Sequence, residues 1–184
     1  MKKMKFIPTK IADVIVIEPE VFGDNRGFFM ETWHAEKFAA GGIEADFVQD
    51  NHSRSAQGIL RGLHYQVTKP QGKLVRVLSG EVFDVVVDLR KKSATFGQWV
   101  GIHLSGENKK MLWVPPGFAH GFYVISPQAD FFYKCTDFYA PEYERAIRWD
   151  DPGLGINWPL VEGKPPILAH KDEAAALFKD AECY

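Results

Sequence analysis

The chain has 184 residues and a formal net charge of −2 at pH 7, which fits one domain over residues 1–184 with a core large enough to surround a ligand pocket. The near-neutral balance excludes a general attraction to nucleic acid or to an anionic membrane surface, so we expect a small-molecule ligand. The two cysteines, Cys135 and Cys183, and the lack of an apolar stretch long enough for a membrane span predict a cytoplasmic protein without disulfides.

Alternating apolar and polar side chains predict short β-strands along most of the chain. The clearest run covers residues 81–89, where Asp84 and Asp88 lie on the face opposite the apolar side chains. Two short helices are expected, at 35–40 and 172–178, with Asp172 capping the second. This pattern predicts an all-β antiparallel sandwich or jelly roll. In chain order, the expected strands are 11–18, 47–51, 59–66, 74–78, 81–89, 99–104, 111–114, 121–125 and 130–136.

Ionisable side chains stand out on the expected strand at 59–66. His64 is the type of side chain best suited to proton transfer near neutral pH, and a hydrogen-bonded core histidine is the alternative. Gln66 shares the face of His64, and Gly62 leaves room there for a ligand or for a neighbouring backbone. Strict alternation places Arg61 on the opposite face, unless a β-bulge at Gly62 brings it to the side of His64.

Three further segments carry groups suited to a pocket. Lys73 begins a strand whose next side chains on its own face are apolar, so it lies either at a pocket mouth or in solvent. Tyr133 is either a core tyrosine with its hydroxyl at the surface or a polar group of the pocket. The loop at 136–144 combines aromatic rings with acids, as binding loops often do. Residues 170–172 are three adjacent ionisable groups, which by default form a solvated helix start.

Residues 113–122 contain a Pro-x-Gly-x-x-His arrangement that ends at His120 and is similar to the second sequence motif of the cupin superfamily. Metal-dependent cupins also need a His-x-His pair, because zinc or iron requires three or more converging ligands. The corresponding stretch here begins at His64 and has glutamine in place of the second histidine. His103 remains a candidate ligand, but we expect no metal site.

Several segments in the same order along the chain resemble the dTDP-4-dehydrorhamnose 3,5-epimerase family, the third enzyme of dTDP-L-rhamnose synthesis. The resemblance runs from about residue 15 to residue 172. It implies a cupin-like jelly roll that is usually a homodimer, in which the N-terminal region of one subunit completes the site of the other. The segments that carry it are residues 21–29, 47–53, 60–64, 72–76, 80–84, 116–121 and 133–136.

The resemblance also implies roles for individual residues. His64 would accept a proton and be oriented by Asp172, while Tyr133 would donate a proton. Lys73 would lie near the ketone, and Tyr139 would stack on thymine. The other positions that it implies in substrate binding are Phe22, Arg26, Glu31, Gln49, Asn51, Arg61, His120, Glu144 and Lys171. From the alternation of its strand, we further expect Asp84 to face inward and to orient His120.

The implied substrate, dTDP-4-keto-6-deoxy-D-glucose, accounts for this set of side chains. Its C4 ketone makes the hydrogens at C3 and C5 removable as an enolate, and inversion needs an acceptor and a separate donor on opposite faces of the ring. Lys73 would stabilise the enolate oxygen. Since no electron is transferred, we expect no cofactor, and the sequence lacks a Gly-x-Gly-x-x-Gly fingerprint.

Three other functions stay open at this point. The first is an epimerase acting at C3 or at C5 alone, or a ketoisomerase, on a related dTDP-4-keto sugar. The second is a metal-dependent cupin oxygenase. The third is a non-catalytic module that binds sugar nucleotides, although the presence of His64, Asp172, Lys73 and Tyr133 together argues against it.

Overall fold

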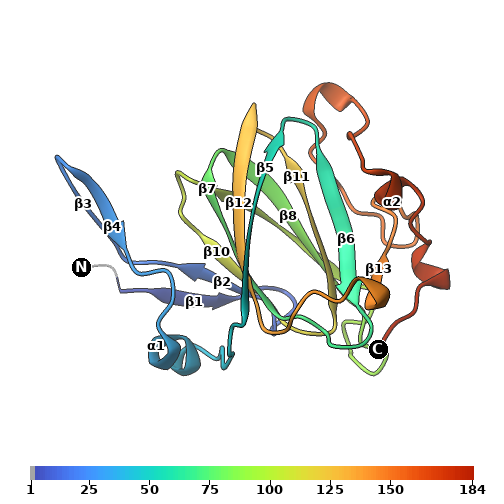
Figure 1. Cartoon of the computed structure of the whole chain (residues 1–184), viewed down its shortest axis with the longest axis horizontal. Coiled ribbons are helices and arrows are strands. Elements are labelled where there is room, and N and C mark those ends of the chain that lie inside the picture. The colour runs from blue at the N-terminus through green and yellow to red at the C-terminus, as the bar shows by residue number, and fades with distance from the viewer. Residues whose placement is uncertain (1–2) are drawn as a thin grey trace.

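The computed structural model describes residues 3–184, so Met1 and Lys2 of the expected domain lie outside the described residues. Two antiparallel sheets face each other in a jelly-roll sandwich (Figure 1). One sheet has the strand order β1-β2-β10-β7-β12-β5, and the other has the order β13-β6-β11-β8-β9. A separate hairpin, β3-β4, projects from the body of the molecule (Figure 1). The predicted all-β fold is therefore confirmed.

The helices and strands are short and joined by turns. The strands are β1 (Lys5–Pro8), β2 (Ile15–Glu18), β3 (Val21–Asp24), β4 (Gly27–Met30), β5 (Gln49–Ala56), β6 (Leu60–Gln66), β7 (Lys73–Ser79), β8 (Glu81–Asp88), β9 (Trp99–Ser105), β10 (Met111–Val114), β11 (Phe118–Val124), β12 (Gln128–Cys135) and β13 (Glu144–Ala146). The helices are α1 (Ala35–Ala40) and α2 (His170–Glu173), with 3-10 turns η1 (Pro141–Tyr143), η2 (Val161–Gly163) and η3 (Phe178–Asp180).

Each expected strand corresponds to an observed one, β2 or one of β5 to β12, with ends that differ by a few residues. The strands β1, β3, β4 and β13 were not expected, because they are three or four residues long and mostly exposed or half-buried, which leaves no alternating pattern. The helix at 35–40 is confirmed. The helix expected at 172–178 is wrong: α2 begins at His170 and ends at Glu173.

The reason for this error lies in Asp172. Its carboxylate does not cap the helix; the N-cap is Ala169, which makes no side-chain hydrogen bond. Asp172 instead lies inside α2, where it is buried and contacts His64. The acid that looked like a local helix signal is therefore used in a long-range contact.

Strand β8 is buried on both of its faces. Val82 and Val86 pack in the core between the two sheets, on the same side as Asp84. Val85 and Val87 pack on the other side, under the C-terminal segment that covers this sheet (Figure 1). Asp84 therefore points into the sandwich, as its place in the alternating pattern predicted.

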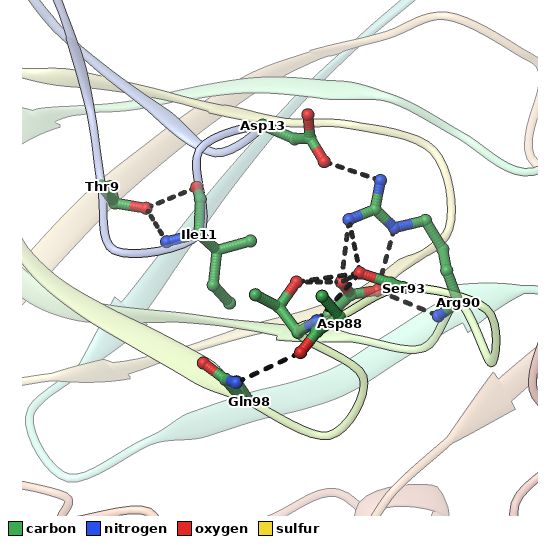
Figure 2. A network of polar contacts seen from close by, with 9 residues as sticks. Thr9, Ile11, Asp13, Asp88, Arg90, Ser93 and Gln98 are labelled. Atoms are coloured by element: carbon green, nitrogen blue, oxygen red, sulfur yellow. Dashed lines mark hydrogen bonds and ion pairs between the residues drawn. The ribbon is translucent and has the colours of Figure 1, made fainter.

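A polar network holds the end of β8 to the turn between β1 and β2 (Figure 2). The buried Asp88 carboxylate accepts hydrogen bonds from Arg90 at 2.8 and 2.9 Å, from Ser93 at 2.7 Å and from Thr95 at 2.6 Å. Arg90 also forms an ion pair with Asp13, at 2.7 Å, in the turn after β1. Burial alone would raise the pKa of Asp88, but these hydrogen bonds outweigh it and hold that pKa far below its ordinary value.

Within residues 3–184, no helix is both long and apolar enough to cross a membrane.

Candidate active site

Side chains from both sheets line a cavity of about 540 Å³. The five-stranded sheet contributes from β6 and β11, the six-stranded sheet contributes from β5, β7 and β12, and the segment around α2 adds further residues. All four side chains expected to carry the chemistry line it, namely His64, Lys73, Tyr133 and Asp172. Seven of the expected substrate-binding residues line it as well: Gln49, Asn51, Arg61, His120, Tyr139, Glu144 and Lys171.

His64 on β6 is paired with Asp172 on α2. The distance from His64 Nε2 to Asp172 Oδ1 is 2.5 Å, and the Asp172 side chain is only 2% exposed. A carboxylate in this position fixes the imidazole ring and stabilises the imidazolium that forms when the ring takes up a proton. It also leaves Nδ1 as the ring nitrogen available to act as a base. The pair has the geometry of a general base with its orienting acid.

A bulge in β6 brings Arg61 and His64 to the same cavity. His64 lies opposite His120 on β11, and Arg61 lies opposite Phe122, so three steps along β6 match two steps along β11. The extra residue breaks the alternation that would otherwise have placed the two side chains on opposite faces. The bulge considered at Gly62 from the sequence is confirmed.

Glycine is required at the bulge. Gly62 has a φ of +137°, and a Cβ atom there would lie 2.5 Å from the Cα atom of Gly121 on the neighbouring strand. Arg61, once turned toward the cavity, donates from Nε to the Oγ atom of buried Ser55 at 3.0 Å. The two glycines thus allow the close strand approach that positions the guanidinium.

Lys73 is a cavity residue, not a solvated lysine at a strand end. It lies at the start of β7, and its Nζ atom is 5.9 Å from the ring centroid of Tyr133. Burial lowers its pKa, and nearby Cys135, Glu144 and Asp84 offset part of that decrease. Among residues 3–184, the Lys73 ammonium has no carboxylate within ion-pair distance. When protonated, Lys73 therefore has no counter-ion among these residues, and its charge is available to a bound anion.

Tyr133 faces the cavity from β12, in the sheet opposite the one that carries His64. Burial raises the pKa of its phenol to about 12. The phenol therefore keeps its proton at neutral pH, as a proton donor must. The base and the candidate donor approach the cavity from opposite sheets.

His120 forms a second buried pair with Asp84 at the inner end of the site. Its Nε2 atom lies 2.9 Å from both carboxylate oxygens of Asp84, and both side chains are buried. Burial raises the pKa of Asp84, while the charges of His120 and Lys73 act in the opposite direction. The expectation that Asp84 faces inward and orients His120 is confirmed.

Polar contacts also organise the outer end of the cavity. The Glu144 carboxylate accepts hydrogen bonds from Lys171 Nζ, at 3.0 Å to each oxygen, and from the Tyr139 hydroxyl at 3.1 Å. The backbone N–H of Tyr139 donates to Gln49 Oε1 at 3.0 Å. Tyr139 is 50% exposed, so its ring is accessible to a ligand at the cavity mouth.

Three expected substrate-binding residues do not line this cavity. Phe22 is in β3, Arg26 is in the turn of the projecting hairpin, and Glu31 follows β4. Arg26 pairs with neighbouring Asp24, and Glu31 pairs with Lys37 at 2.8 Å. The β3-β4 hairpin, which carries Phe22 and Arg26, projects from the body of the chain (Figure 1).

His103, the remaining candidate metal ligand, lies outside the cavity and pairs with Glu81 on the surface at 2.8 Å. No group of three His, Cys, Asp or Glu side chains within residues 3–184 has an arrangement suited to a metal ion.

The sequence interpretation missed the apolar part of the cavity. Short apolar runs do not show which members line a cavity and which fill the core, so no available signal separated the two groups. The apolar side chains that line the cavity are Ile59, Leu60, Phe122, Phe131, Ile167 and Leu168.

The family model of dTDP-4-dehydrorhamnose 3,5-epimerase matches residues 8–180. The chain belongs to this family. The dTDP-4-dehydrorhamnose 3,5-epimerase of Pseudomonas aeruginosa is 58% identical to this family member over 98% of the chain and 99% of the relative. A crystal structure of dTDP-6-deoxy-D-glucose-3,5-epimerase from Legionella pneumophila, in complex with dTDP-4-keto-L-rhamnose, superposes with a TM-score of 0.94. It is 56% identical, and the match covers 98% of this chain and 95% of that one.

A more distant neighbour has a narrower activity. The crystal structure of a 3'-monoepimerase from Streptomyces bikiniensis in complex with dTDP-quinovose has a TM-score of 0.86 and 34% identity. The match covers 92% of this chain and 86% of that one. The same scaffold thus occurs in epimerases described as acting on two carbons and on one.

Proposed function

We propose that this protein epimerises dTDP-4-keto-6-deoxy-D-glucose at C3 and C5 to give dTDP-4-keto-L-rhamnose, through an enolate and without a cofactor. The observation that carries the proposal is one cavity with the His64–Asp172 pair on one side and Tyr133 on the opposite sheet. The resemblance of the whole chain to 3,5-epimerases supports the same reaction.

In each inversion, His64 Nδ1 removes the proton on a carbon beside the ketone. The electron pair of that C–H bond becomes the C=C bond of the enolate, and the π pair of the carbonyl moves to the C4 oxygen. Tyr133 then gives a proton to the opposite face of the same carbon, the ketone re-forms, and proton exchange with solvent returns His64 and Tyr133 to their starting states. General acid-base catalysis contributes on the order of 10²–10⁴-fold. A donor at the developing oxyanion adds on the order of 10²–10³-fold, and Lys73 is placed to supply it. Asp172 stabilises the imidazolium between the two proton transfers.

Arg61 and His120 lie beside the sugar end of the cavity in this proposal, where both donate to oxygen atoms of the substrate. Tyr139 stacks on thymine at the mouth, and Gln49 and Asn51 contact the substrate from β5. Glu144 and Lys171 form a neutral pair beside Tyr139, so the diphosphate needs a further cation.

We infer that this cation is Arg26 of a second copy of the chain, which exchanges its solvent-exposed ion pair with Asp24 for the diphosphate, in a homodimer whose hairpins complete each other's sites. The Arg26 side chain is 85% exposed at the tip of β3-β4. We propose that Phe22 of the same hairpin stacks on thymine together with Tyr139. Its side chain is 47% exposed, and those of Phe28 and Phe29 are 60% and 69% exposed. Such apolar exposure on a projecting hairpin is characteristic of a contact surface. Glu31, just after β4, belongs to the same completed site.

We also infer a cytoplasmic location, which the free thiols of Cys135 and Cys183 support. The proposed partners are the nucleotide sugar and the second subunit, with neither nucleic acid nor a membrane among them.

Proton NMR in deuterium oxide tests the reaction directly. The wild-type protein is expected to exchange the hydrogens at C3 and C5 of dTDP-4-keto-6-deoxy-D-glucose and to form the L-sugar. His64→Ala is expected to abolish exchange at both carbons while the protein stays folded. Exchange at C3 alone would instead identify a monoepimerase, the alternative that the Streptomyces bikiniensis neighbour favours. Absence of exchange at both carbons would contradict the proposed function.

A further inference from the structure

Gln66 is a buried polar residue that the mechanism does not use. It lies on β6 two residues after His64, its exposed fraction is 3%, and it does not line the cavity. Its side chain makes three hydrogen bonds to the main chain. Gln66 Oε1 accepts from the Ala140 N–H at 2.9 Å, and Nε2 donates to the carbonyl oxygens of Lys69 at 2.8 Å and Phe138 at 3.3 Å.

Two of these bonds go to the residues on either side of Tyr139. Since Gln49 accepts from the Tyr139 N–H itself, glutamine side chains bind three consecutive residues of the loop. Apolar packing cannot hold this part of the loop, because the side chains of Phe138 and Tyr139 are 60% and 50% exposed. The side-chain amides of Gln66 and Gln49 therefore hold the backbone that carries the Tyr139 ring, while Glu144 accepts from the hydroxyl of that ring.

We propose that Gln66 is a positioning residue for the nucleotide subsite, which holds Tyr139 at a fixed place relative to His64. The inference rests on the proposed function, in which Tyr139 stacks on thymine. Gln66 and His64 lie on the same strand, so one element fixes both the ring that binds the base of the nucleotide and the imidazole that removes the proton. Because the Ala140 N–H is in a buried residue, loss of its acceptor leaves a polar group unpaired and favours rearrangement of the loop.

The decisive variant is Gln66→Met, which keeps the length of the side chain and removes its hydrogen bonds. The dissociation constant of dTDP, measured by calorimetry, is expected to rise roughly three- to tenfold, as part of the stacking interaction is lost. KM is expected to rise with it, while kcat stays within about threefold of wild type, because the proton-transfer groups are untouched. Gln57→Met is the matched control: Gln57 also bonds a backbone carbonyl, that of Ile125, but away from this loop, so dTDP affinity should not change.

A double-mutant cycle separates positioning of Tyr139 from general destabilisation. In the Tyr139→Ala background, Gln66→Met should weaken dTDP binding no further. A full additional loss there, or unchanged dTDP affinity in Gln66→Met alone, would overturn the inference. If Gln66→Met does not fold, Gln66→Asn replaces it. Asparagine is neutral but one methylene shorter, so it cannot bond Ala140 and Phe138 together as glutamine does, and a smaller loss that also vanishes in the Tyr139→Ala background is expected.

These outcomes are distinct from failure of the proposed reaction. If Tyr139→Ala leaves dTDP affinity unchanged, both the stacking assignment and the role of Gln66 are wrong, whereas exchange at C3 and C5 in the NMR experiment would still establish the epimerase.

Discussion

Burial changes the pKa values of two side chains in the cavity in opposite directions. It raises the pKa of Tyr133 to about 12 and lowers the pKa of Lys73. Both residues lie in the six-stranded sheet, opposite His64. The proposed donor and the proposed cation are thus on one side of the cavity, and the proposed base with its orienting acid is on the other.

Removal of the phenol should separate the two halves of the reaction. In Tyr133→Phe, His64 still removes the proton, so deuterium from solvent should continue to enter the substrate while formation of the L-sugar slows by about 10²-fold or more. Exchange and product formation are followed in the same NMR sample. His64→Ala is the control, in which both should stop. Equal slowing of exchange and product in Tyr133→Phe would assign the donor role to another group.

The pH dependence of kcat/KM should report the ionisation of Lys73. In the proposed mechanism, the ammonium form of Lys73 stabilises the enolate, so activity should fall when this group loses its proton. Because burial lowers the pKa of Lys73, that fall should occur at a lower pH than for an ordinary lysine, whose pKa is about 10.4. In Lys73→Arg the charge persists to higher pH, so the alkaline limb of kcat/KM should move upward even where the rate is reduced. An alkaline limb that does not move would show that another group titrates there.

The four side chains that the sequence proposed for catalysis all line one cavity, because proton transfer uses few residue types and the family motifs mark their positions. The environment of each residue was less predictable. Taken alone, the segment around Lys73 favoured a solvated lysine, and the side of the strand on which Arg61 lies depended on an unproved bulge. Both questions are decided by contacts between strands distant in sequence, such as the approach of Gly62 to Gly121.

Among the strands, β8 shows how one element serves both the site and the fold. Asp84 near its middle faces the cavity region and binds His120, while Asp88 at its end binds Arg90, Ser93 and Thr95 (Figure 2). The alternation predicted both acids on one face, and this is confirmed. Their different roles were not predictable, because the partners come from separate segments.

Asp88 should make stability dependent on pH at the acid end. Its pKa in the folded protein lies below the unfolded value of about 3.9, so the ionised carboxylate stabilises the fold above that pH, and this contribution is lost as pH falls toward the folded pKa. Asp88→Asn should lower the free energy of unfolding at pH 7 by about 2–4 kcal/mol. The difference from wild type should narrow below about pH 4.

Urea unfolding at pH 7 and pH 3 measures this difference. Asp150→Asn is a matched control with the same change of charge, because Asp150 is paired with Arg148 at a partly exposed surface position. It should cost no more than about 1 kcal/mol. A loss of stability in Asp88→Asn that is equal at both pH values would contradict the predicted linkage.

At the scale of the whole molecule, our proposal is that the hairpin of a second subunit completes the cavity. The β3-β4 hairpin, which carries Phe22 and Arg26, projects from the body of its own chain (Figure 1). At the mouth of the cavity, Lys171 is already paired with Glu144. The jelly roll was predictable from its strand pattern. The direction of the hairpin was not, because no alternation marks a strand pair exposed on both sides.

Mixing two inactive variants should restore activity if hairpins are exchanged between subunits. The first is the double variant Phe22→Ala/Arg26→Ala, which lacks the proposed hairpin contacts. The second is His64→Ala, which lacks the proposed base. In a mixed dimer, the site with intact His64 receives an intact hairpin from its partner. After joint unfolding and refolding, activity should approach that of one site per mixed dimer, and sedimentation should show a dimer. Absence of recovery, with mixed dimers present, would contradict exchange.

The acid that aligns His64 lies 108 positions later in the chain. On the ribosome, the thirteen strands found in residues 3–184 therefore emerge before Asp172 does. A polypeptide that ends before this residue lacks the carboxylate that contacts the imidazole. If His64 is the base, as we propose, full competence for proton abstraction is acquired only near the end of synthesis.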